Sequence, residues 1–289
     1  MRKMTGILAA LLITQAQAEE TTGEKIPLNS PVRGSIIASL LQRYDTPFVL
    51  YPYESNYLLY TYTSNINKKA ISSYNWSSNA RKDEVNYQIS LAFPLWRGIA
   101  GDNSLLAMSY TQKAWWQLTN QSESAPFRET NYEPQLFVGW ATNYSLGDWK
   151  LRDVEIGYNH QSNGRSNPTS RSWNRIYSRL MAQNGGWLVE IKPWLALSGG
   201  KDNDNADITK YVGYYRLRVG YIWGDSVFSA EGGYNWNTGY GSGGVSWSYP
   251  LTDHVRFYTK VFSGYGESLI DYNHRQTRVG VGFTLNDVF

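Results

Sequence analysis

Apolar and polar residues alternate with a period of two along most of the chain. The clearest stretches are 85–93, 187–195, 215–221 and 279–285. In the last of these, one face carries Val279, Val281, Phe283 and Leu285, and the other carries Arg278, Gly280, Gly282 and Thr284. A period of two places successive side chains on opposite faces of an extended backbone, so the pattern predicts β-strands rather than helices.

Twelve segments of this kind follow one another. They start near residues 48, 84, 104, 131, 148, 172, 186, 210, 226, 243, 254 and 276. Gly, Asn, Asp and Ser gather between them, as in NGG and WGDS. Several segments are about 10 residues or longer, which suits a tilted strand that crosses a bilayer. No apolar run of about 18 residues follows the N-terminus, so the sequence excludes membrane-spanning helices.

The charges and aromatic residues favour a membrane barrel over a soluble β-sandwich. The non-apolar face repeatedly carries Arg, Lys and Glu, as a polar lumen would. Aromatic residues near the segment ends indicate the girdles of an outer-membrane barrel: Tyr51, Tyr53, Trp96, Trp115, Trp116, Trp140, Trp149, Trp223, Trp236, Trp247 and Tyr249. An even number of antiparallel strands closes without an exposed edge. We therefore predict an all-β, transmembrane antiparallel β-barrel of twelve strands over residues 47–289.

The N-terminus indicates export. A basic start (Arg2 and Lys3), an apolar run over 6–14 and a small-residue site ending at Ala18 predict a cleaved signal peptide over 1–18. Localisation in the cell outer membrane follows from this signal and the barrel. The net charge of the full chain is +3, and cleavage would remove two basic residues from it. A charge this small gives no indication of nucleic-acid binding. The chain has no Cys, which excludes disulfide bonds.

Residues 19–46 differ from the strands that follow them. They are polar apart from one short apolar piece, SIIASLL, at 35–41. We expect a short N-terminal extension here, a tail or plug segment with a helical turn.

One stretch departs from the alternation in an informative way. It reads GYNHQSNGRSNPTSRSWNR. Strand parity places His160 and Ser162 on the apolar, lipid-facing side together with Ile156. In the next segment, Asn174 shares the same outward face with Ile176. Three polar residues therefore lie on the face where the other segments place apolar ones.

These three residues have a workable catalytic geometry. His160 and Ser162 are two residues apart on one face, about 6.5–7 Å at Cα, and a His ring can bridge that gap. Asn174, on the neighbouring strand, could bond the other ring nitrogen and fix the tautomer. We assign His160 as base, Ser162 as nucleophile and Asn174 as orienter, because a neutral orienter costs less beside lipid than a carboxylate. A His-x-Ser triplet alone is unspecific, and the assignment depends on the shared lipid face.

The same residues carry a family resemblance. The motif, with ETNYEPQLFVGWATNY before it and NWNTGYG and SGYGESLIDYN after it, resembles the outer membrane phospholipase A of Gram-negative bacteria over almost the whole mature chain. The resemblance implies hydrolysis of phospholipids and lysophospholipids at the sn-1 and sn-2 acyl esters, dependence on Ca²⁺, and activation by formation of a homodimer in the membrane. It also matches His160, Ser162 and Asn174 to the catalytic residues.

The resemblance further implies a set of calcium ligands. The Arg165 carbonyl and Ser170 match ligands in the loop, and Ser124 matches a ligand given by the partner subunit. A carboxylate from KDNDNAD aligns with Asp204, but this loop differs in length from the family pattern, so Asp202 remains an alternative. Oxygen ligands of these kinds suit calcium, although any one loop Asp could simply be solvated.

Gln112 is a second polar residue on a lipid-facing side, among Leu106, Met108 and Tyr110. A Gln in hydrocarbon is costly unless it bonds across an interface. We predict that Gln112 hydrogen-bonds its counterpart or a partner carbonyl in the homodimer. Alternatively, it lies near the headgroups and is hydrated.

A passive barrel, either a small porin or an adhesin scaffold, is the alternative from another functional class. A porin would keep its unusual polar residues in the lumen or at a constriction. Here they lie on the outside, which favours an enzyme that acts on the membrane itself.

Overall fold

The computed structural model describes residues 35–45, 50–197 and 204–286. Within them it contains two short α-helices, two 3-10 turns and thirteen strands. The helical elements are α1 (Ile36–Gln42), η1 (Ser77–Asn79), η2 (Gln121–Glu123) and α2 (Ile208–Val212). The strands are β1 (Tyr51–Pro52), β2 (Asn56–Thr63), β3 (Asp83–Arg97), β4 (Ser104–Trp116), β5 (Phe127–Leu146), β6 (Trp149–Ser162), β7 (Ser172–Asn184), β8 (Trp187–Leu197), β9 (Tyr215–Trp223), β10 (Ser226–Asn235), β11 (Tyr240–Pro250), β12 (Arg256–Gly264) and β13 (Gln276–Asn286).

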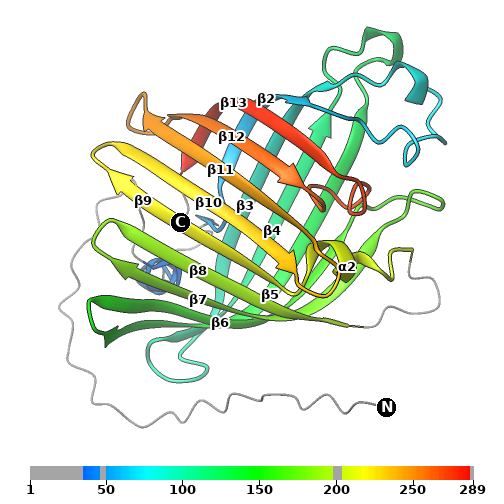
Figure 1. The fold of residues 1–289 in the computed structure, drawn as a ribbon. Coiled ribbons are helices and arrows are strands. Elements are labelled where there is room, and N and C mark those ends of the chain that lie inside the picture. The colour runs from blue at the N-terminus through cyan, green and yellow to red at the C-terminus, as the bar shows by residue number, and fades with distance from the viewer. Residues whose placement is uncertain (1–34, 46–49, 198–203, 287–289) are drawn as a thin grey trace.

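Twelve of the strands close into a barrel (Figure 1). Each strand from β2 to β12 pairs antiparallel with the next, and β13 pairs antiparallel with β2. The short strand β1 adds only to β3. Closure leaves no edge of the ring unpaired, as a hydrocarbon environment requires. The predicted fold, a twelve-stranded antiparallel barrel, is therefore confirmed. Neither helix of the described segments is long and apolar enough to cross a membrane.

Two predicted strand starts are wrong. The strand expected near residue 48 begins at Asn56, because Pro52 has no N–H with which to continue the ladder of β1. The strand expected near residue 210 begins at Tyr215, since the chain first forms α2. That helix ends where Gly213, at a φ of 71°, donates its N–H to the Thr209 carbonyl.

The two faces of the barrel carry the side chains that the alternation predicts. Lipid-facing Ile156 and Leu195 are 52% and 70% exposed, whereas lumen-facing Glu155 and Glu190 are completely buried. Three girdle predictions are wrong. Tyr51 and Tyr53 are buried in the main hydrophobic cluster, and Trp115 is completely buried inside the barrel, with Lys113 Nζ 4.8 Å from its ring. Strand alternation allows only one of the neighbours Trp115 and Trp116 to face lipid, and that residue is Trp116.

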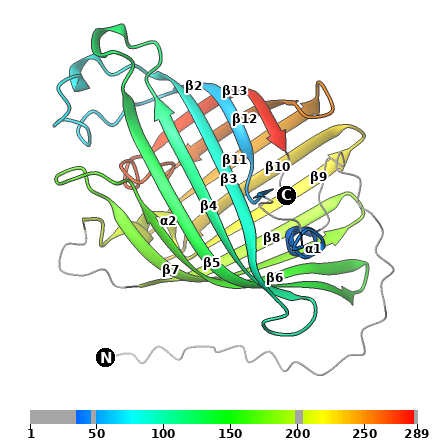
Figure 2. The ribbon, with the colours of Figure 1, turned by 180° about the vertical axis from the view of Figure 1, so that it is seen from behind.

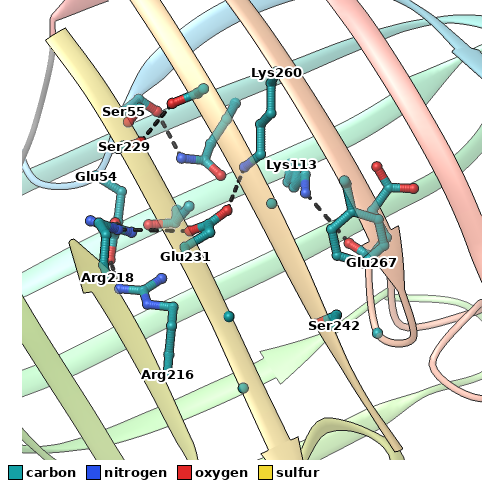
Figure 3. A pocket seen from close by; sticks show the side chains of 18 of the residues that line it. Glu54, Ser55, Lys113, Arg216, Arg218, Ser229, Glu231, Ser242, Lys260 and Glu267 are labelled. Atoms are coloured by element: carbon teal, nitrogen blue, oxygen red, sulfur yellow. Dashed lines mark hydrogen bonds and ion pairs between the residues drawn. The ribbon is translucent and has the colours of Figure 1, made fainter. Parts of the chain in front are cut away.

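Ion pairs cross the lumen (Figure 3). Arg216 and Arg218 both bind Glu54, at 2.8 and 2.7 Å, and Lys260 binds Glu231 at 2.6 Å. These contacts surround a polar cavity of about 290 Å³. The lumen is thus filled largely by a hydrogen-bonded network of side chains.

The described part of the N-terminal extension forms α1. Ser35 caps this helix by accepting a hydrogen bond from the Ala38 N–H at 2.8 Å. The Ser35 hydroxyl also donates to Asp153, and the Ile36 N–H donates to the same carboxylate at 2.9 Å. The helix is therefore anchored to the inner wall of β6. The predicted signal peptide, 1–18, lies outside the described residues.

Apolar packing holds α1 in place. Ile36, Ile37 and Leu40 are completely buried in the main hydrophobic cluster, which also includes Phe137 of β5. Gly139 makes room for this packing, because a Cβ there would lie 2.4 Å from the Ile37 Cδ1 atom. The two views place α1 and α2 at opposite ends of the barrel (Figures 1 and 2).

The lengths of the connections orient the barrel in the membrane. Two-residue turns join strands at the α1 end, as at 147–148 and 185–186. Longer loops, including 64–82, 163–171 and 265–275, lie at the α2 end. Outer-membrane barrels have short periplasmic turns and long extracellular loops. The α2 end therefore faces outward, and the 163–171 loop lies at that end.

Candidate active site

The hairpin of β6 and β7 brings two of the predicted residues into contact. His160 lies directly opposite Asn174 in the register of the pair. His160 Nδ1 is 2.8 Å from Asn174 Oδ1. Because an amide oxygen can only accept, this contact assigns the proton to Nδ1 and leaves Nε2 as the basic nitrogen. The predicted cross-strand bond is present.

Ser162 lies on the same strand face, two residues beyond His160. It pairs with Tyr132 of β5 on one side and with Ser172 of β7 on the other, and its side chain is half-buried. The His160 ring bonds Asn174 through Nδ1. Its other nitrogen, Nε2, has no hydrogen-bond partner among the described residues. Nε2 is thus free to receive a proton. Catalytic hydrogen bonds often close only when substrate binds.

Sequence reasoning missed Tyr158, a third residue that contacts Asn174. Its phenol donates to Asn174 Oδ1 at 2.7 Å. Tyr158 is lipid-facing and 44% exposed. Strand parity could have indicated it, because it precedes His160 by two residues, but aromatic residues are common on this face.

The loop after β6 is organised by a second missed residue, Asn163. This side chain is 3% exposed. Its Nδ2 donates to the Thr169 carbonyl at 2.8 Å, and its Oδ1 accepts from the Arg171 N–H at 3.0 Å. Asn163 therefore fixes both ends of the loop. Its place between Ser162 and Gly164, which has a φ of 64°, is the only sequence signal.

Buried carboxylates beneath the loop hold it from below. Glu129 accepts from Asn163 Nδ2 at 3.2 Å and lies 3.5 Å from Arg165 Nε. The Arg165 guanidinium also donates to the Phe127 and Arg128 carbonyls, at 3.0 and 3.2 Å. The side chain of Arg165 is thus bonded to Glu129 and to the backbone of β5, which is consistent with a role for its carbonyl alone in the loop.

Arg128 extends this support to the loop between β12 and β13. Its guanidinium binds Glu84 and Asp271, each at 2.6 Å, and all three side chains are buried. Burial alone would raise the pKa of the Asp271 carboxyl, but the adjacent Arg128 charge outweighs burial and holds that pKa below its usual value. The acidic group therefore stays ionised beneath the extracellular loops.

The expected calcium ligands that the structure describes lie at one end of the barrel. Ser170 is half-buried at the end of the loop, and Asp204 is half-buried just before α2. With its amide nitrogen turned toward Asp204, Asn167 donates to the two carboxylate oxygens at 3.0 and 3.2 Å. Asp204 therefore lies beside the loop. Asp202 lies outside the described residues.

Ser124 lies on the adjoining connection between β4 and β5. It is exposed and adopts a left-handed backbone conformation at a φ of 55°. An exposed hydroxyl at this end of the barrel is accessible to a second protomer.

The donor chemistry fits calcium better than a transition metal. In the described part of the chain, no group of three or more His, Cys, Asp or Glu side chains could hold a metal ion. The residues at the loop instead offer a hydroxyl, a carbonyl and one carboxylate. Such a mixed oxygen set suits a hard divalent cation with a high coordination number.

Gln112 lies on the outward face of β4, as predicted, and has contacts within its own chain. Its Nε2 donates to the Tyr87 hydroxyl at 3.4 Å, and its Oε1 accepts from the Tyr110 hydroxyl at 3.2 Å. Both distances are long for bonds between these groups. A second amide or carbonyl could therefore compete for Gln112 at little cost.

The comparisons with known proteins agree on one family. The phospholipase A1 family model matches residues 36–285. A phospholipase A1 from Proteus vulgaris is 69% identical over 283 residues, which cover 98% of this chain and 97% of that protein. The phospholipase A1 of Escherichia coli K12 is 64% identical over 291 residues, which cover 100% of both chains.

Solved structures give the same result. The outer membrane phospholipase A from Escherichia coli superposes with a TM-score of 0.86 at 69% identity, covering 89% of this chain and 99% of that one. A Salmonella typhi outer membrane phospholipase, described as a dimer with bound calcium, gives a TM-score of 0.86 at 69% identity with the same coverage.

Proposed function

The chain belongs to the phospholipase A1 family of phospholipid ester hydrolases and is located in the outer membrane, and on this basis we propose that Ser162, His160 and Asn174 are its catalytic triad. The observation that carries the proposal is the contact of 2.8 Å between His160 Nδ1 and Asn174 Oδ1 on the lipid-facing surface. A polar cluster there has direct access to acyl esters of the surrounding leaflet.

The three residues have distinct roles in this proposal. Asn174 accepts from Nδ1–H and keeps the imidazole in the tautomer with a basic Nε2. His160 Nε2 takes the proton from Ser162 Oγ as that oxygen attacks the ester carbonyl. The imidazolium then protonates the leaving lysophospholipid oxygen, which gives an acyl-serine. Water, activated by the same Nε2, releases the fatty acid in a second step.

We further propose that calcium binds next to this site. The Arg165 carbonyl, Ser170 and Asp204 would hold the ion, and Ser124 from the partner subunit would complete the site. Asp204 is taken as the carboxylate ligand because the Asn167 amide, with its nitrogen turned toward Asp204, ties this carboxylate to the loop. The bound ion would supply positive charge near the ester oxygen as negative charge develops there.

Dimerisation follows from the shared ligand set. If Ser124 of one protomer completes the site of the other, two copies are needed for full activity. Gln112, on the outward face of β4, would bond the partner across the interface. The substrates proposed are phospholipids and lysophospholipids, cleaved at the sn-1 and sn-2 positions.

The test is release of fatty acid from mixed micelles of detergent and phospholipid. We expect release by the wild-type protein with calcium and its loss when a chelator removes the metal. Ser162→Ala should reduce release by a factor of about 10³ or more, because the nucleophile is lost. Wild-type protein that releases no fatty acid in the presence of calcium would support a passive barrel, and full activity of Ser162→Ala would exclude the proposed nucleophile.

A further inference from the structure

Tyr158 and His160 bind the same atom. Tyr158 pairs directly with Ile176 across the β6–β7 hairpin, so its phenol reaches Asn174 diagonally along the lipid-facing surface. It donates to Asn174 Oδ1 at 2.7 Å, and His160 Nδ1 is 2.8 Å from the same oxygen. One amide oxygen therefore accepts from both neighbours.

The orientation of the Asn174 amide decides the state of the imidazole. Rotation of the amide by half a turn would present its NH₂ group to His160, and Nδ1 would then have to accept. The proton would move to Nε2, where it prevents the ring from acting as a base toward Ser162. On this lipid-facing surface few waters compete for the amide, so solvent does not fix one orientation over the other. A fixed donor next to Asn174 is therefore required.

The Tyr158 phenol has the properties of such a donor. Its oxygen lone pair is delocalised into the ring, so a phenol donates a hydrogen bond better than it accepts one. The backbone of β6 holds it two residues from His160, and its ring lies among lipid-facing side chains such as Leu136. The phenol thus selects the amide orientation in which Oδ1 faces His160.

We propose that Tyr158 is a positioning residue of the hydrolytic site, which acts through Asn174 to hold the His160 imidazole as the Nδ1–H tautomer. This inference rests on the function proposed above. The competing explanation is that the phenol merely satisfies its own hydrogen-bonding need at the membrane surface. In that case the bond serves Tyr158 alone, and its removal leaves catalysis unchanged.

The first test is Tyr158→Phe, which removes the hydroxyl and keeps the ring. We expect kcat to fall about fivefold, the equivalent of one neutral hydrogen bond, with KM unchanged. Tyr249→Phe is the matched control: this residue is lipid-facing and 44% exposed on β11, away from the β6–β7 hairpin, and should keep full kcat. Rates are compared per folded molecule.

A double-mutant cycle separates action through Asn174 from any independent effect. In an Asn174→Ala background, Tyr158→Phe should cause no further loss of kcat, because the amide that Tyr158 positions is absent. An equal loss in both backgrounds would overturn the proposal.

The tautomer can also be read directly. The chain has three His residues, so ¹⁵N-histidine spectra in micelles are simple. We expect the wild-type His160 signals to show Nδ1–H alone and those of Tyr158→Phe to show a mixture, with His254 and His274 unchanged. Tyr158→Phe with full kcat and an unchanged His160 spectrum would overturn the inference and leave the proposed function standing. Wild-type protein without esterase activity would overturn both.

Discussion

At the scale of single residues, several polar side chains on the outside of this barrel have partners on the same surface. Tyr158 and His160 both bond Asn174 Oδ1, and Gln112 contacts two tyrosine hydroxyls. Hydrocarbon offers no solvation, so an unpaired polar group there is costly. This requirement makes a polar cluster on the lipid-facing side informative about chemistry.

The site residues differ in how far the sequence alone could predict them. His160, Ser162 and Asn174 follow from parity, since they lie on two strands joined by one loop and parity is a local property. Tyr158 and Asn163 could not be found in this way. Their roles depend on which atoms the strand register and the loop bring within reach, and neither residue type is unusual at its position.

Asp271 gives a prediction at this scale. Asp271→Asn removes the charge that binds Arg128 at 2.6 Å and leaves a buried guanidinium underpaired. We expect a loss of about 3 kcal/mol in the free energy of unfolding at pH 7. The measurement is urea-induced unfolding from lipid vesicles, followed by Trp fluorescence.

The pH dependence of the same variant follows from linkage. The folded-state pKa of Asp271 is depressed, so its stabilising contribution is complete above the unfolded pKa of about 4 and is lost as the pH falls through the folded-state value. The difference between wild type and Asp271→Asn should therefore shrink below about pH 4. Asp253→Asn, in an exposed turn, is the control and should show no such difference. A difference that stays constant down to pH 3 would contradict the assignment.

At the scale of elements, the alternation predicts most strands but not the points where backbone chemistry interrupts them. Pro52 ends β1 because it lacks a donor, and Gly213 ends a helical turn where a strand was expected. Tyr53 and Trp115 were assigned to a girdle because they lie near segment ends, and that position does not say which face of the barrel a side chain takes. Each of these errors depends on a single residue.

The position of helix α1 against the inner wall can be tested by filling the space that Gly139 leaves for it. Gly139→Val places a branched side chain where even a Cβ would lie 2.4 Å from Ile37 Cδ1, so the helix should be displaced from the inner wall. The chain has no Cys, so Ser39→Cys, buried on α1, provides a unique reporter. We expect a small thiol reagent to label it at least about tenfold faster in Gly139→Val.

The control for this experiment is Gly243→Val, on the outward face of β11 with Val245, where the nearest atom to an added Cβ is 3.8 Å away. It should leave the labelling rate of Ser39→Cys near that of the parent. Equal rates in the Gly139→Val variant and the parent would show that α1 is not held by this contact.

At the scale of the whole molecule, twelve strands close into a barrel, and ion pairs connect side chains across its lumen. The charged lumen and the apolar exterior were both predictable, because the period of two runs through nearly every strand. The charge pairing inside was not predictable, since it joins residues such as Glu54 and Arg216 that are far apart in the sequence.

The proposed dimer gives the whole-molecule prediction. Gln112→Leu removes the amide that would bond the partner and leaves the apolar face of β4 intact. We expect the yield of chemically crosslinked dimer in detergent with calcium to fall about threefold. This corresponds to the loss of one side-chain hydrogen bond within a membrane, which contributes about 0.6 kcal/mol. Val245→Leu, lipid-facing on β11, should leave the yield unchanged. An unaltered yield in Gln112→Leu would exclude this residue from the interface.

The outward position of the His160–Asn174 pair also determines which measure of substrate concentration sets the rate of the proposed enzyme. An acyl ester reaches the outer wall by lateral movement within the leaflet, so the relevant quantity is the number of ester molecules per unit area of membrane. Two membranes with equal total phospholipid would then be hydrolysed at different rates if one were diluted with lipid that carries no acyl ester. For such a protein, the packing and composition of the bilayer take the place that solution concentration has for a soluble hydrolase.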